Sequence, residues 1–146
     1  MTLRWALGVT LLSAVADRFG LWGPPGAVNI SWGDWSRFVA YTAQVNSFLP
    51  AAVAPELAVV ATVAELALGL ALLLGVWPRL VAWATCGLLT LFAVAMTFSF
   101  GVKAPLNLSV FVDAAGALLL AVWPRKAVTR REKPYSPETN RPGDAL

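Results

Sequence analysis

Four ionisable side chains stand inside long apolar stretches of the sequence: Asp17, Arg18, Glu65 and Asp113. A charge at the centre of a lipid bilayer costs about 2.5–3.5 kcal/mol on insertion scales, so such residues normally face a protein interior and find a partner there. Carboxyl groups in that setting can hold or transfer a proton, and a guanidinium can polarise a carbonyl oxygen. We therefore expect these four residues to bind a ligand or to exchange protons.

The spacing of the acids indicates a common depth. Two Trp-Pro-Arg sequences, beginning at Trp77 and Trp123, are typical of helix ends at a membrane surface. At 1.5 Å per residue, Glu65 lies about 18 Å from the first and Asp113 about 15 Å from the second. Asp17, in an apolar run of opposite direction, lies about 18 Å from the same surface. The sequence predicts three carboxylates near the bilayer midplane.

A purely structural interpretation of these residues stands beside the functional one. Arg18 could pair with one internal acid, and hydroxyls such as those of Thr62, Thr97 and Ser109 could hydrogen-bond between helices. The polar side chains would then hold the helices in register and bind nothing.

The elements that position these side chains follow from composition. Of the 146 residues 58% are hydrophobic and 13% are charged, and the mean hydropathy is +0.68, which a soluble domain of this size could not bury. Four continuously apolar runs could cross a layer about 30 Å thick as helices. They are residues 3–21, 53–77, 80–101 and 106–123. We predict one all-α domain over residues 1–125, an integral membrane four-helix bundle.

The distribution of Lys and Arg predicts the orientation of this bundle. With four spans both termini share a side, and most basic residues fall on that side, which should be cytoplasmic. They are Arg4, Arg79, Arg125, Lys126, Arg130, Arg131 and Lys133. Residues 126–146, polar and rich in proline, are expected to form a disordered basic cytoplasmic tail. The predicted location is the bacterial inner membrane, with the lipid bilayer as the first partner and a homodimer as a further expectation.

The first apolar run also resembles a secretory signal, with Arg4, an apolar segment and Ala14-Val15-Ala16 as a cleavage site. Apolar character resumes beyond that site at Phe19, Leu21 and Trp22, which favours a retained helix.

The long first loop, from about residue 22 to 52, should lie on the outer side. Asp34 or Ser31 could cap a helix that runs to about Val45, and its apolar residues share one face. We expect this amphipathic helix to lie in the membrane interface. Trp32 and Trp35 are membrane anchors in one interpretation and a lid over the bundle mouth in the other.

Several classes of function are excluded by what the sequence lacks. It has no His, so haem and ordinary imidazole metal sites are not expected, and its single Cys86 has no partner for an intramolecular disulfide. It has no Gly-rich phosphate loop and no nucleophile elbow, and its basic cluster lies in the tail, so neither a self-contained enzyme nor nucleic-acid binding is expected.

Three stretches resemble the DoxX family of small bacterial membrane proteins. They are DRFGLWGPPG at 17–26, ATVAELALG at 61–69, and GVKAP at 101–105 continuing to SVF at 109–111. The resemblance covers residues 3–123. It implies a four-helix membrane fold with a retained first helix, and association with membrane redox systems, including a subunit similar to that of thiosulfate:quinone oxidoreductase.

Together these observations favour a non-catalytic membrane subunit that binds a quinone or another lipid-soluble molecule for an oxidoreductase partner, with no covalent cofactor. Glu65 and Asp113 would exchange protons, Arg18 would polarise a carbonyl oxygen or hold Asp17, and Lys103 would guard the outer mouth. A proton-coupled transporter and a scaffold for a redox partner are the alternatives.

Overall fold

The structure is a computed structural model that describes residues 2–124, and within them all regular secondary structure is helical. The elements are α1 (Thr2–Arg18), α2 (Trp35–Val45), the 3₁₀ turn η1 (Ala51–Val53), α3 (Ala54–Leu74), α4 (Pro78–Phe100), α5 (Lys103–Asn107) and α6 (Val110–Val122). The all-α prediction is confirmed. The predicted disordered tail, 126–146, lies outside the described residues.

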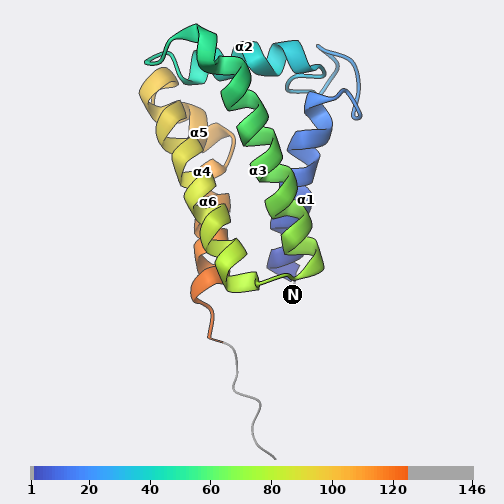
Figure 1. Ribbon diagram of the computed structural model, residues 1–146, viewed down its shortest axis with the longest axis vertical. Coiled ribbons are helices and arrows are strands. Elements are labelled where there is room, and N and C mark those ends of the chain that lie inside the picture. The colour runs from blue at the N-terminus through green and yellow to red at the C-terminus, as the bar shows by residue number, and fades with distance from the viewer. Residues whose placement is uncertain (1, 125–146) are drawn as a thin grey trace, which may run out of the picture.

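Helices α1, α3, α4 and α6 run along the long axis of the molecule, and α2 lies across one end of them (Figure 1). Helix α1 packs against α3, and α4 packs against α6; contacts of α3 with α4 and of α1 with α6 join the two pairs. The first residues of α1 and the last of α6 lie at the end opposite α2. We call the end that carries α2 the α2 end.

The α1 and α3 backbones approach closely at two glycines. A Cβ atom added to Gly69 would lie 2.9 Å from Leu12 Cγ and 3.2 Å from the Gly8 carbonyl oxygen, and one added to Gly8 would lie 2.9 Å from Leu73 Cδ2. A Cβ atom at Gly87, on α4, would have no neighbour within 4 Å. Only the first two of these glycines are needed for close helix packing.

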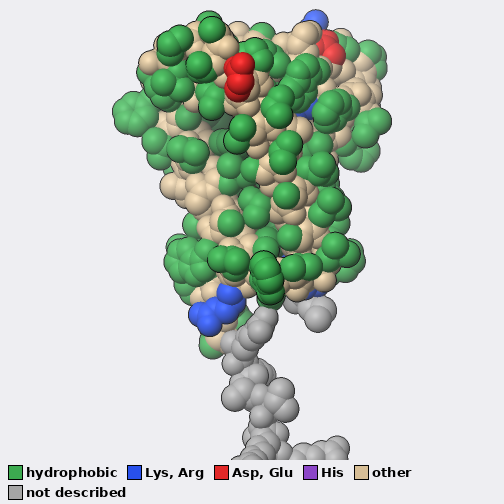
Figure 2. Space-filling model, viewed as in Figure 1, with side chains coloured by type: hydrophobic (Ala, Val, Ile, Leu, Met, Phe, Trp, Pro, Cys, Tyr) green, Lys and Arg blue, Asp and Glu red, His purple; other side chains and the backbone are tan. Residues whose placement is uncertain are grey.

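Apolar side chains fill the space between the helices and also cover the outside of the shaft. Leu7, Leu11, Leu72 and Leu89 belong to the buried core, whereas many other large apolar side chains are exposed. Figure 2 shows this apolar surface along the shaft, with the visible charged side chains mostly at its two ends. Such a surface is suited to lipid.

The helix boundaries differ from the prediction in the first and last apolar runs. The first helix ends at Arg18 and not near residue 21, because Gly20 takes a left-handed conformation (φ +70°). The last run, predicted as one helix from 106, is divided because Ser109 is also left-handed (φ +56°), which separates α5 from α6. Two helices of the described chain, the one over 51–74 and the one over 78–100, are long and apolar enough to cross a membrane.

Candidate functional site

Arg18 and Glu65 form a buried ion pair between α1 and α3. Arg18 Nη2 donates to both carboxylate oxygens of Glu65, at 2.6 and 2.7 Å, and Arg18 Nη1 donates to Thr62 Oγ1 at 2.8 Å. Each side chain of the ion pair is only 3% exposed. Charge-assisted bonds of this length are strong, so they fix the α2 end of α1 against the middle of α3. This is the arrangement that the structural interpretation expects of Arg18.

Asp17 turns away from Arg18 and holds the first loop. Its Oδ2 accepts hydrogen bonds from the backbone N–H groups of Ser31, at 3.0 Å, and Trp32, at 3.1 Å. Its Oδ1 is buried without a hydrogen-bond partner among the described residues, and so is Arg18 Nε. The predicted contact in which Arg18 holds Asp17 is therefore not formed.

Aromatic side chains cover the ion pair from the side of α2. The Arg18 guanidinium lies 3.8 Å from the ring centroid of Phe38 and 5.4 Å from that of Trp32. Trp32 packs edge-on against Phe38, with centroids 5.1 Å apart. Trp35 instead stacks on Phe19 at 5.7 Å. Trp32 thus lies over the Arg18 guanidinium, whereas Trp35 packs on Phe19 just after the end of α1.

A cavity of about 1230 Å³ lies beneath this cover, walled by α1, α2, α3, α4 and α6. Its lining is mostly apolar but includes Asp17, Arg18, Glu65 and Asp113, with Trp32 at the α2 end. The structure thus brings four of the predicted site residues to one space. Lys103 and Trp35 do not line it, and Lys103 is exposed as the first residue of α5.

The three acids line different walls of this cavity and do not form one cluster. Asp113 stands half-buried in the first turn of α6, Asp17 faces the loop, and Glu65 is held by Arg18. In the described part of the chain, no group of three acids, cysteines or histidines is close enough to hold a metal ion.

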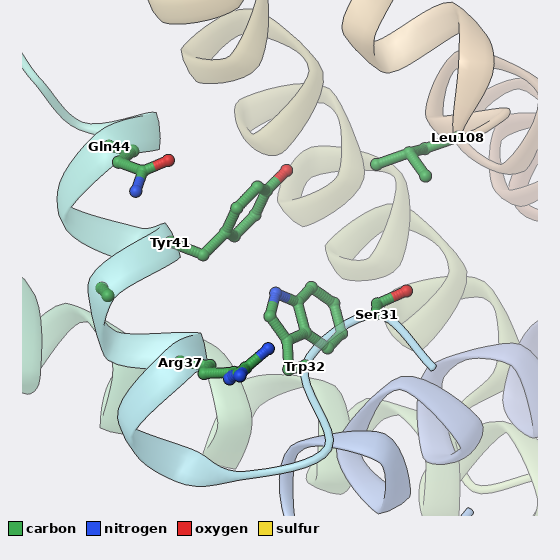
Figure 3. A pocket seen from close by; sticks show the side chains of 7 residues that line it. Ser31, Trp32, Arg37, Tyr41, Gln44 and Leu108 are labelled. Atoms are coloured by element: carbon green, nitrogen blue, oxygen red, sulfur yellow. The ribbon is translucent and has the colours of Figure 1, made fainter. Parts of the chain in front are cut away.

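A second pocket, of about 580 Å³, opens beside α2 (Figure 3). It contains three polar residues of α2 that the sequence interpretation did not single out: Arg37, Tyr41 and Gln44. Their spacing of four and three residues places them on one helix face, a pattern that could have indicated them. Asp34 caps this helix, as predicted, by accepting from Arg37 N at 2.8 Å.

Comparison of the sequence with known protein families identifies the family of this chain. The family described as "Methylamine utilisation protein MauE" matches residues 1–107, from α1 to the end of α5. The chain belongs to the MauE family. MauE proteins are a membrane family associated with methylamine utilisation, so this MauE-family chain is a membrane protein. No curated protein and no solved structure gave a match.

This result corrects the resemblance to DoxX, which was wrong. The stretches behind it combine an acid inside an apolar helix with Gly and Pro in the following loop. Such features do not identify one family, because any acid inside a membrane helix must be paired and any membrane helix must end at the surface. The expected likeness to a thiosulfate:quinone oxidoreductase subunit loses its support with the family.

Proposed function

We propose that this MauE-family protein binds a lipid-soluble molecule of the quinone class in the cavity under α2, as a non-catalytic component of an amine-utilising redox system. Helices α1, α3, α4 and α6 would span the bacterial inner membrane with both termini in the cytoplasm. The supporting observation is that Asp17 and Arg18 line this cavity and that Asp17 Oδ1 and Arg18 Nε, both buried, have no hydrogen-bond partner among the described residues.

These two atoms match the two redox states of a quinone. A buried acceptor and a buried donor each lose free energy when left unsatisfied. A quinone carbonyl can accept from Arg18 Nε, and a quinol hydroxyl can donate to Asp17 Oδ1. Asp113, on α6, would exchange with the ligand, one at a time, the two protons that accompany the two electrons supplied or withdrawn by the redox partner. The apolar lining would accept the ring and the isoprenoid chain.

The shorter helices are compatible with four spans. Helix α6 is 13 residues long, or about 20 Å, and α1 is 17 residues long, or about 25 Å. A bilayer thins around short helices at a modest free-energy cost. The preceding α5 adds length on the α2 side of α6.

The test is the quinone content of protein purified from native membranes in mild detergent. We expect near-stoichiometric quinone after solvent extraction of the unmodified protein. Asp17→Asn should lose most of it, because the amide can keep an oxygen toward the N–H groups of Ser31 and Trp32 while its NH₂ replaces the free acceptor. Glu56→Gln, an exposed acid outside the cavity, is the matched control and should keep the quinone.

Asp113→Asn should retain the quinone but remove the pH dependence of its binding, because the proton-exchanging group is lost. Gel filtration would verify that each variant is folded. Quinone at the level of carried-over lipid in every sample would refute the proposal and favour a scaffold for a redox partner.

One observation favours transport as a second candidate. The helical conformation is interrupted between α5 and α6 at Ser109, four residues before Asp113. Discontinuous helices often surround the binding sites of transporters. Proton uptake into liposomes that contain the protein, abolished by Asp113→Asn, would support this candidate. Uptake equal to that of empty liposomes would exclude proton-coupled transport.

A further inference from the structure

The second pocket adjoins the cavity and carries polar groups of α2 that do not line the cavity. Seven residues line it: Ser31, Trp32, Arg37, Ala40, Tyr41, Gln44 and Leu108. Helix α2 supplies one wall, the preceding loop another, and Leu108, between α5 and α6, closes the far side. Figure 3 shows the Arg37 guanidinium beside the Trp32 indole, with Tyr41 and Gln44 further along α2.

The polar groups of this pocket are mostly hydrogen-bond donors. A guanidinium and an indole N–H can only donate, and a phenol and a primary amide each add donors. In the part of the chain that the structure describes, the side chains of Arg37, Trp32 and Tyr41 donate no hydrogen bond to another residue. Burial also raises the pKa of Tyr41 above its ordinary value, so its hydroxyl stays protonated at neutral pH. The pocket therefore offers donors that lack acceptors.

The charge of Arg37 is only weakly countered. Its Nε lies 3.8 Å from Asp34 Oδ2, beyond hydrogen-bond distance, and both side chains are well exposed. The other oxygen of Asp34 accepts from Ser36 Oγ and from Arg37 N. The two Nη groups of Arg37 thus remain available, and their planar fork suits a phosphate or carboxylate group.

We propose that this pocket binds the anionic headgroup of a membrane phospholipid, with the phosphate on Arg37. The position of the pocket favours a lipid over a free anion. Helix α2 lies across the end of an apolar shaft, the level at which headgroups lie. Trp32, Tyr41 and Leu108 line both this pocket and the apolar cavity, so an acyl chain would find apolar surface next to the bound headgroup. This proposal does not depend on quinone binding, because it uses neither the Arg18–Glu65 pair nor Asp113.

Native mass spectrometry of the delipidated protein in detergent tests the proposal by titration with phosphatidylglycerol and with phosphatidylcholine. We expect one phosphatidylglycerol to bind about tenfold more tightly than phosphatidylcholine, because both lipids offer a phosphate to Arg37 but the choline cation of phosphatidylcholine offsets its charge. Arg37→Gln should abolish this preference. Lys103→Gln removes an exposed cation at the same end outside the pocket, and should leave it unchanged. Asp34→Asn keeps a good N-cap residue, removes the competing charge, and should tighten binding about twofold.

Three outcomes would overturn the proposal. Equal affinity for the two lipids, or equal effects of Arg37→Gln and Lys103→Gln, would show that the pocket does not select an anionic headgroup. Glycerol phosphate, which has the headgroup without acyl chains, separates the two sources of phosphate. If it binds as tightly as phosphatidylglycerol and Arg37→Gln weakens it equally, the site is one for free anions.

Discussion

At the scale of single residues, the Arg18–Glu65 pair explains how a guanidinium is tolerated inside this apolar molecule. Both carboxylate oxygens and Thr62 accept its Nη hydrogens, and Phe38 lies against its face. Removal of one partner leaves the other charge buried, which is more costly than the loss of both.

Glu65→Gln should therefore destabilise the protein by about 3–5 kcal/mol, because it leaves the Arg18 charge uncompensated. Arg18→Met combined with Glu65→Gln should recover part of that loss. Thermal unfolding in detergent measures both effects. Glu56→Gln, exposed at the start of α3, is the control and should leave the melting temperature unchanged. A Glu65→Gln variant as stable as the unmodified protein would contradict this role of the ion pair.

The sequence predicted the types of the site residues better than their partners. Depth and polarity identified Asp17, Arg18, Glu65 and Asp113, and all four line one cavity. The partner of Asp17 was not predictable, because backbone N–H groups 14 and 15 residues later carry no sequence signal of their own. The path of the loop decides that contact.

At the scale of elements, α2 ties the two helix pairs together. Near its start Phe38 covers Arg18, and at its end Ser99 on α4 donates a hydrogen bond to the Val45 carbonyl oxygen at 2.6 Å.

The Asp34 cap was predictable from the sequence, since an aspartate just before an apolar helical pattern marks a helix start. The break at Ser109 was not, because no Gly or Pro stands there.

The stability of α2 should depend on pH through its cap. Hydrogen bonds from Arg37 N and Ser36 lower the pKa of Asp34 below its ordinary value of 3.8. Its contribution is therefore complete above pH 3.8 and is lost as the pH falls through the lower folded-state pKa. Hydrogen exchange of the α2 amides should increase over that acidic range. Asp34→Asn, which cannot titrate, should show no such increase.

The α1–α3 contact should be sensitive to a single methyl group. Gly69→Ala places a Cβ against Leu12 and the Gly8 carbonyl, and overpacking of this kind costs about 1–3 kcal/mol. Gly87→Ala, also within a helix but facing open space, should be neutral or slightly stabilising, since Ala favours helices. The free energies of unfolding of the two variants in detergent measure this difference. Equal effects at the two positions would show that α1 and α3 do not need this close approach.

At the scale of the whole molecule, the all-α class and the membrane environment followed from composition alone. The family did not, because an acid inside an apolar helix and a Gly- and Pro-containing loop, which do not identify one family, were taken as specific to DoxX. The helices also leave two of the four predicted spans short, since the conformations of Gly20 and Ser109 shorten the first and last apolar runs.

Cysteine accessibility tests the proposed topology. After Cys86→Ala, Gln44→Cys at the α2 end should react with a membrane-impermeant maleimide in intact cells, whereas Thr2→Cys at the other end should react only after permeabilisation. This pattern is expected because Arg4 and Arg79 lie at the terminal end of the bundle and basic residues are retained in the cytoplasm. The reverse labelling pattern would show the opposite orientation.

The ion pair also has a consequence for biosynthesis. Glu65 follows Arg18 by 47 residues, so Arg18 leaves the ribosome well before its acid does. Until α3 is made, α1 carries an unneutralised guanidinium near its α2 end, and that end should remain at the water boundary. Emergence of Glu65 would then draw the end of α1 inward, so that α1 and α3 complete their insertion as one unit.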